Sequence, residues 1–157
     1  MPCACDGAFY KCGVRALMLT ISKKLYEEII AHCKREHPKE ACGILAGNSG
    51  MVEQIYPMKN VENSPIGYAM DPKEQLSVEK KMRACKLRMV GIYHSHTASE
   101  AYPSSVDVSL AVSADVSYML ISLKDHGSPV AKSFSIDGLK ITEETIEIAA
   151  VSHGLIK

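Results

Sequence analysis

The sequence carries no excess of either charge, because 18 lysine and arginine residues balance 18 aspartate and glutamate residues. Domains that bind DNA, RNA or an anionic membrane usually carry a basic excess. We therefore expect neither a nucleic acid nor a membrane surface as a partner.

Long apolar runs are also missing, since none approaches the roughly 20 residues that a membrane-spanning helix needs. The N-terminus lacks the charged start and the long apolar stretch of a secretory signal. The chain contains six cysteines, which we expect to be free thiols in a reducing compartment. The sequence therefore predicts a cytoplasmic protein in which Cys33, Cys42 and Cys85 are small core residues.

Internal repeats and low-complexity segments are absent as well. The chain has 157 residues, of which 46% are hydrophobic, and this amount suits one packed core. Residues 1–15 show no clear periodicity. We divide the chain into an N-terminal cysteine-containing tail, 1–17, and one domain, 18–157, with Met18 as a candidate for the true start.

The periodicity of apolar residues predicts three helices and about eight strands. Ser22 is a candidate N-cap for the first helix, Pro38 ends it, and Asp71 with Pro72 opens the second. The predicted helices cover 23–36, 72–87 and 103–113. The predicted strands cover 16–21, 41–46, 51–58, 67–70, 88–93, 116–123, 130–136 and one or two within 139–151. Several strands are joined by hairpin-length turns, so we expect an α/β fold with a mixed β-sheet flanked by helices.

The end of one predicted strand carries a pair of histidines. His94 and His96 are two residues apart on an extended chain, so their side chains share a face. Asp107 follows in the first turn of the next predicted helix. Two imidazole nitrogens and one carboxylate oxygen suit zinc, and three protein ligands leave a fourth position for water. Zinc lowers the pKa of such a water to about 7, so hydroxide is available at neutral pH.

Hydrolysis also needs a proton carrier, and Glu40 is the best candidate, although no spacing rule selects it. Ser104 could donate a hydrogen bond to an oxyanion. Each signal has a simpler interpretation. A His-x-His pair alone is weak evidence of a metal site, Ser104-x-x-Asp107 fits a capping box, and a lone glutamate is usually a solvated surface residue.

Taken together and in order, these residues resemble the JAMM motif of the MPN+ domain metalloproteases. The motif consists of Glu40, then His94-Ser-His96, then seven residues, then Ser104-x-x-Asp107. The resemblance extends over roughly residues 18–147. Supporting similarity to the family lies in the segments 38–47, 60–61, 68–72 and 91–96.

The resemblance implies a fold like that of the cytidine deaminases, with a mixed sheet between helices. It implies that His94, His96 and Asp107 bind zinc. It also implies Glu40 as the general acid and base and Ser104 as oxyanion support.

One departure from the family pattern follows the second histidine, where members usually carry proline and this chain carries Thr97. Proline would stiffen the exit of the strand, so Thr97 predicts a looser loop with no lost ligand. Members also often carry an insertion that clamps the ubiquitin-like partner. The loop between Met58 and Met70 is too short to leave much room for one.

The family cleaves after the C-terminal Gly-Gly of ubiquitin or ubiquitin-like proteins, and compact prokaryotic members resemble enzymes that process sulfur-carrier proteins. We therefore expect a ubiquitin-like or sulfur-carrier partner with a Gly-Gly tail, which could add as a strand beside a sheet edge. A general isopeptidase comes second. A catalytically silent MPN scaffold or a metal-binding protein is the alternative outside the enzyme class. The sequence leaves a homodimer open.

Three cysteines precede the region of resemblance. Cys3, Cys5 and Cys12 match no zinc-finger spacing, and a disordered tail is the simpler interpretation. The other hypothesis is that a thiolate of the tail takes the open position of the zinc and silences the enzyme.

Overall fold

The structure is a computed structural model that describes residues 17–150. The predicted tail and its three cysteines lie outside these residues. In chain order the described elements are β1 (Met18–Ser22), α1 (Lys23–Glu36), β2 (Cys42–Asn48), β3 (Met51–Met58), α2 (Pro72–Ala84), β4 (Arg88–His96), α3 (Ser105–Leu110), β5 (Ser117–Ser122), β6 (Val130–Asp137) and β7 (Lys140–Ala149).

Helix α1 has the predicted bounds, because its two end signals act as expected. The Ser22 hydroxyl accepts a hydrogen bond from the Leu25 amide at 3.3 Å, which caps the first turn. The chain leaves the helix at His37, directly before Pro38. The face of α1 that carries Ile29 and Cys33 is fully buried.

Helix α2 begins where predicted and α3 begins at Ser105, two residues after its predicted start, and both end earlier than predicted. Asp71 caps α2 by accepting from the Lys73 amide at 2.7 Å, and Pro72 is the first helical residue. Helix α2 ends at Ala84 because Lys86 adopts a positive φ of 57°. Helix α3 ends at Leu110 because Ala111 is extended.

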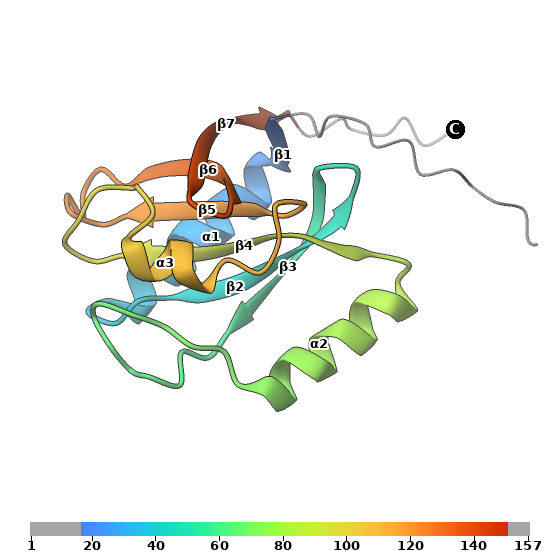
Figure 1. Ribbon diagram of the computed structural model, residues 1–157, viewed down its shortest axis with the longest axis horizontal. Helices are drawn as coiled ribbons and strands as arrows, with labels where there is room; N and C mark the ends of the chain where they lie inside the picture. The colour runs from blue at the N-terminus through green and yellow to red at the C-terminus, as the bar shows by residue number, and fades with distance from the viewer. Residues whose placement is uncertain (1–16, 151–157) are drawn as a thin grey trace, which may run out of the picture.

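The seven described strands form one mixed sheet that closes into a barrel in the order β1-β3-β2-β4-β5-β6-β7. The mixture of parallel and antiparallel pairs was predicted. The closure was not, and it depends on parallel pairing of β1 with β7, from Met18 opposite Thr145 to Ser22 opposite Ala149. These two strands lie together at the upper edge of the ribbon, while α2 lies below β2 and β4 (Figure 1).

Alternate residues of β2 face the two longer helices. Leu45 packs in the cluster that contains Ile29 of α1, and Ile44 packs in the cluster that contains Val78 of α2. The central strands are thus buried on both faces. This packing holds β4, the strand that carries the two histidines, in place.

One predicted strand and one predicted core cysteine differ in the structure. The predicted strand over 67–70 is only an isolated bridge between Asn60 and Met70. Cys33 and Cys42 are buried as predicted, but Cys85 is exposed because it follows the last turn of α2.

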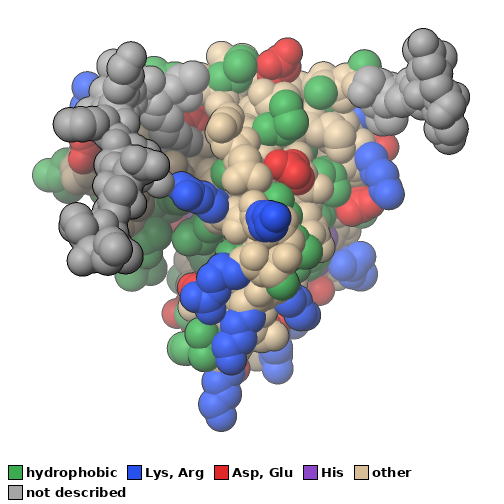
Figure 2. All heavy atoms as spheres, turned by 90° about the vertical axis from the view of Figure 1, so that its right-hand side faces the viewer, with side chains coloured by type: hydrophobic (Ala, Val, Ile, Leu, Met, Phe, Trp, Pro, Cys, Tyr) green, Lys and Arg blue, Asp and Glu red, His purple; other side chains and the backbone are tan. Residues whose placement is uncertain are grey.

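Lysine and arginine side chains gather on the lower part of the face in Figure 2, where α2 lies. The exposed basic residues of this helix are Lys73, Lys80, Lys81 and Arg83. Charge is therefore unevenly placed on a chain whose net charge is zero. No helix in residues 17–150 is long and apolar enough to cross a membrane.

Candidate metal centre

The end of β4 places two imidazoles side by side. Strand β4 continues through His96, between β2 and β5, so His94 and His96 project from the same face. Both side chains are buried, and their Nε2 atoms lie 3.1 Å apart. On the opposite face, Tyr93 donates to or accepts from His32 Nδ1 at 2.8 Å and packs over Gly43, where a Cβ would overlap its ring. The strand is thus held from behind.

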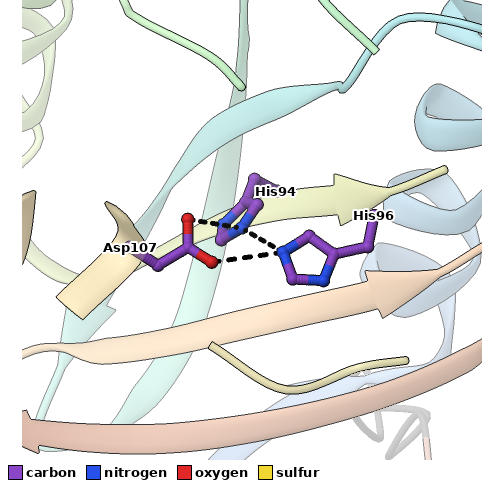
Figure 3. Close-up of side chains that lie close together, drawn as sticks. All are labelled: His94, His96 and Asp107. Atoms are coloured by element: carbon purple, nitrogen blue, oxygen red, sulfur yellow. Dashed lines mark hydrogen bonds and ion pairs between the residues drawn. The ribbon is translucent and has the colours of Figure 1, made fainter. Parts of the chain in front are cut away.

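Helix α3 brings Asp107 to the same point. One carboxylate oxygen lies 3.2 Å from His94 Nε2, and the other lies 3.2 Å from His96 Nε2 (Figure 3). The capping-box interpretation also holds. Ser104 Oγ accepts from the Asp107 amide at 3.1 Å, and Asp107 Oδ2 accepts from the Ser104 amide at 2.7 Å. The cap therefore fixes the direction of the Asp107 carboxylate.

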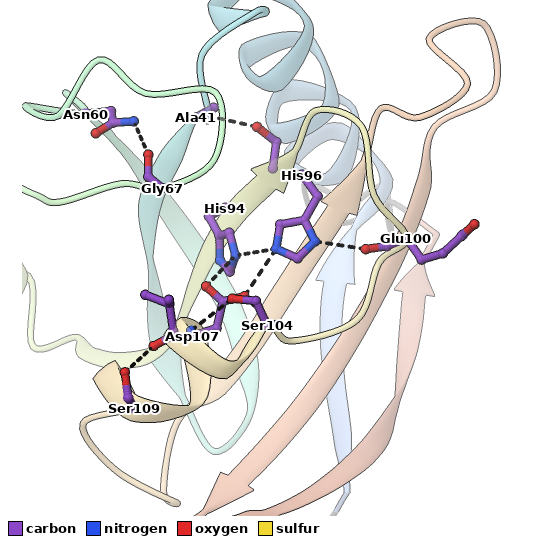
Figure 4. Close-up of polar contacts among 11 residues, drawn as sticks. Ala41, Asn60, Gly67, His94, His96, Glu100, Ser104, Asp107 and Ser109 are labelled. Atoms are coloured by element: carbon purple, nitrogen blue, oxygen red, sulfur yellow. Dashed lines mark hydrogen bonds and ion pairs between the residues drawn. The ribbon is translucent and has the colours of Figure 1, made fainter.

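Among the described residues, these three side chains form a group that could hold a metal ion. Their ligand atoms all lie within 4.8 Å of one another. The Nδ1 atom of His96 donates to the main-chain carbonyl of Glu100 at 2.8 Å, which leaves the Nε2 lone pair directed at the centre (Figure 4). The donor set of two imidazole nitrogens and a carboxylate fits a divalent metal such as zinc.

Electrostatics favour the ligand forms of two of these groups. Burial lowers the pKa of His94, so its neutral imidazole is favoured. Burial opposes ionisation of Asp107, but hydrogen bonds from His94 and His96 outweigh it and hold the pKa of Asp107 below its usual range. Burial also lowers the pKa of His96, but its contacts with Asp107 and the Glu100 carbonyl raise it overall. A metal must therefore compete with a proton at His96.

Glu40 lies in the cleft beside these residues. It directly precedes Ala41 and the start of β2, and it is only 6% exposed. Burial raises the pKa of Glu40 to about 7, and the negative charge of Asp107 adds to this while His96 opposes it. A carboxyl that titrates near neutral pH can both accept and donate a proton there.

The cleft has a volume of about 230 Å³ and lies between residues 65–68 and helix α3. The ring of Tyr68 lies against His94, with centroids 4.7 Å apart. Thr97 occupies the position of the usual proline, and we expected a looser loop there. The structure instead joins this loop to the cleft wall, because Thr97 Oγ1 donates to the Pro65 carbonyl at 2.8 Å.

Sequence reasoning missed several residues that support this site. Asn60 and Ser95 bind the main chain around Glu40, and Glu100 orients His96 through its carbonyl. Asn60 lies in a segment that resembles the family, which is a usable signal. A main-chain carbonyl such as that of Glu100 leaves no signal in residue identity.

The family described as prokaryotic homologs of the JAB domain has a sequence model that matches residues 22–137. The chain belongs to this family. The match includes the residues of the candidate metal centre and most of the barrel. The α/β MPN fold expected from the sequence is confirmed, with barrel closure as an addition.

Two curated relatives of this JAB-family chain are named as a peptidase and a protease. The chain is 43% identical over 133 residues to the CysO-cysteine peptidase of Mycobacterium tuberculosis, and the aligned region covers 83% of this chain and 91% of the relative. It is 39% identical over 97 residues to the probable TtuB-protein conjugate cleaving protease of Thermus thermophilus, which covers 61% and 65%. The chain is an enzyme of the same hydrolytic class.

Solved structures resemble the JAB-family fold described above. A protein from Desulfitobacterium hafniense, solved in solution, has a TM-score of 0.78 at 41% identity and covers 87% of this chain and 96% of its own. A JAB1/MPN domain protein from Archaeoglobus fulgidus has a TM-score of 0.54 at 18% identity and covers 82% and 97%. The second similarity concerns the fold alone.

Proposed function

We propose that the protein is a zinc-dependent peptidase that cleaves the bond following the C-terminal Gly-Gly of a ubiquitin-like protein, with a sulfur carrier as the first-ranked substrate. The observation that carries the proposal is the convergence of His94, His96 and Asp107 at the side of a cleft that Glu40 also lines. The relatives support the substrate class, because one is named for CysO-cysteine and another for a TtuB-protein conjugate.

The side chains of this site have separate tasks in the proposed reaction. Zinc held by His94, His96 and Asp107 would lower the pKa of a bound water and polarise the scissile carbonyl. Glu40 takes the proton of the attacking water and passes it to the leaving amine. The Ser104 hydroxyl accepts a hydrogen bond from the Asp107 amide. Its own O–H donates a hydrogen bond to the developing oxyanion.

The shape of the cleft suits a tail of small residues. Its volume of about 230 Å³ is below the usual range for ligand pockets, and the exposed side chains of Ile66 and Leu110 belong to its two walls. Strand β4 is paired on both sides, with β2 and with β5, so it has no free edge to which a tail could add. The tail therefore lies between residues 65–68 and α3, where two glycines fit and larger side chains would meet the walls.

The test is cleavage of a purified ubiquitin-like carrier that ends in Gly-Gly-Cys, followed by intact mass. We expect the zinc-loaded protein to remove the cysteine. Glu40→Gln should retain zinc and lose at least about 100-fold in rate. A carrier ending in Val-Val-Cys is the matched substrate control and should stay intact. An unchanged mass with fully zinc-loaded wild type would contradict the proposal.

The conjugate-cleaving relative supports a second candidate within the same chemistry, which is an isopeptidase. A carrier joined through its Gly-Gly tail to a lysine side chain distinguishes the two. Faster release of the lysine conjugate than of cysteine would rank the isopeptidase first. Stoichiometric zinc with no cleavage of either substrate would instead favour a silent scaffold or a metal-binding protein.

A further inference from the structure

The peptide group between Glu40 and Ala41 is held by side chains on both of its polar atoms. It lies one residue before the ladder of β2, which begins at Cys42. The Glu40 carbonyl accepts from Asn60 Nδ2 at 3.0 Å, and the Ala41 amide donates to Ser95 Oγ at 2.8 Å. Both side chains come from elsewhere in the chain, so tertiary structure fixes this peptide group.

Asn60 uses its full hydrogen-bonding capacity. Its Nδ2 atom donates to the carbonyls of Glu40 and Gly67, both at 3.0 Å, and Figure 4 shows the second of these bonds. Its Oδ1 atom accepts from the amides of Glu62 at 3.0 Å and Ala69 at 3.2 Å. An amide side chain offers two donors and two lone pairs, so this buried side chain is locked in one orientation.

A main-chain bond reinforces the same connection, because the Glu40 amide donates to the Ser64 carbonyl at 2.9 Å. Residue 40 is therefore bound through both its N–H and its C=O to the loop that forms one wall of the cleft. These contacts fix the backbone dihedral angles of Glu40, and with them the direction in which its side chain leaves the main chain.

Ser95 links the same peptide group to the metal ligands. It is fully buried and lies between His94 and His96, with its side chain on the opposite face of β4. Its main-chain amide also donates to the Ala41 carbonyl at 3.0 Å. Because Ser95 moves with the ligand strand, it holds residue 40 in register with the two histidines.

We propose that Asn60 and Ser95 are positioning residues that clamp the Glu40–Ala41 peptide group and so aim the Glu40 carboxyl at the water beside the metal ligands. The inference rests on the proposed role of Glu40 as general base. Misplacing a catalytic group by about 1 Å can cost roughly 100-fold in rate. The position of the Glu40 carboxyl thus depends on two segments that are distant in sequence, one carrying Asn60 and the other Ser95.

The first test measures kcat, KM and zinc content of Asn60→Ala and Ser95→Ala on the Gly-Gly-Cys carrier. Each variant should lose about 100-fold in kcat, with KM and zinc content close to those of wild type. In a Glu40→Gln background neither substitution should reduce the rate further. Ser64→Ala is the matched control, because it removes only the hydroxyl bond to Ile66 and leaves the main-chain bond to Glu40.

A second measurement needs neither metal nor substrate. Carbon-detected NMR titration of metal-free protein should place the Glu40 carboxyl pKa near 7 in wild type and closer to 4.5 in Asn60→Ala, since a released side chain reaches water. If Asn60→Ala does not fold, Asn60→Asp replaces it, because it keeps the Oδ1 acceptor and loses the donors to Glu40 and Gly67.

The inference is overturned if the variants keep the wild-type rate and titration, or if their losses persist in the Glu40→Gln background. Wild type that cleaves no carrier, while its Glu40 titration still depends on Asn60, would contradict the proposed function and leave the clamp supported.

Discussion

Burial sets the proton affinity of Glu40. The side chain is nearly inaccessible, and its pKa rises from 4.5 to about 7 chiefly because the charged form loses hydration. The same burial that suits the carboxyl to proton transfer makes its ionisation costly in the folded protein. Function and stability therefore oppose each other at this residue.

Glu40→Gln should stabilise the metal-free protein in a pH-dependent manner. Between about pH 4.5 and pH 7 the folded state keeps a proton that the unfolded state releases, so wild-type stability falls as pH rises through this window. The gain from glutamine should be close to zero near pH 4 and up to about 3 kcal/mol near pH 8. Urea unfolding with a chelator at both pH values measures it.

The exposed Glu79→Gln on α2 is the control and should change little at either pH. A gain for Glu40→Gln that is the same near pH 4 and pH 8 would contradict the raised pKa.

The structure brings together the five side chains that the sequence singled out, and their catalytic roles stay predictions. The spacing of His94, His96 and Asp107 suits a metal site, whereas Glu40 and Ser104 were selected with them through the resemblance to the JAMM motif. The side chains of Asn60 and Ser95 form hydrogen bonds to the main chain of residues 40 and 41, which are distant in sequence. Residue identity carries little information about such contacts.

Helix α3 is only six residues long, and Asp107, the proposed metal ligand, is also part of its capping box. Ser104 and Asp107 bond reciprocally through side chain and main chain. The cap thus supplies the orientation that a short helix could not provide by packing, since none of its residues is buried.

Two substitutions at Ser104 should separate the cap from the oxyanion contact. Glycine is a tolerated N-cap, whereas alanine costs about 1 kcal/mol. We expect Ser104→Ala to weaken zinc affinity roughly 10-fold and Ser104→Gly to stay closer to wild type. Both should lose about 100-fold in kcat because both lack the hydroxyl. Chelator competition and steady-state kinetics provide the two measurements.

Ser109→Ala on the same helix is the control, because the Ser109 hydroxyl bonds only to the Val106 carbonyl. Equal zinc affinity for the glycine and alanine variants would show that the cap does not support the ligand.

Helices were predicted best at their starts. Ser22, Asp71 and Ser104 all cap as expected, because an N-cap depends on a local side-chain contact. The C-terminal ends of α2 and α3 were placed too late. Neither Lys86, with its positive φ, nor Ala111 is a residue type that marks a helix end.

A metal at this site would join β4 to α3 and so stabilise the whole folded domain. Free zinc at about 1,000 times its Kd adds about 4 kcal/mol to the free energy of unfolding, or roughly 10 °C in Tm for a chain of this size. We expect this shift in wild type and its loss in His96→Ala. Differential scanning calorimetry with and without zinc tests it.

His126→Ala, at an exposed turn histidine, should keep the full shift. An equal shift in His96→Ala would place the stabilising metal elsewhere on the protein.

Barrel closure lay beyond sequence reasoning for a physical reason. The alternation of apolar residues reports which faces of a strand are buried, but not which strand lies next to it. The pairing of β1 with β7 joins segments from opposite ends of the described chain. Its energetics depend on the completed fold, so no local pattern specifies it.

The same pairing determines how the folded domain responds to force. Strands β1 and β7 are parallel neighbours, with Met18 beside Thr145 and Ser22 beside Ala149. Tension between the start of β1 and the end of β7 pulls the two strands along each other in opposite directions. Their hydrogen bonds are then loaded together in shear and do not open one after another. When an unfoldase pulls on its ends, the domain should therefore unfold more slowly than its thermodynamic stability alone suggests.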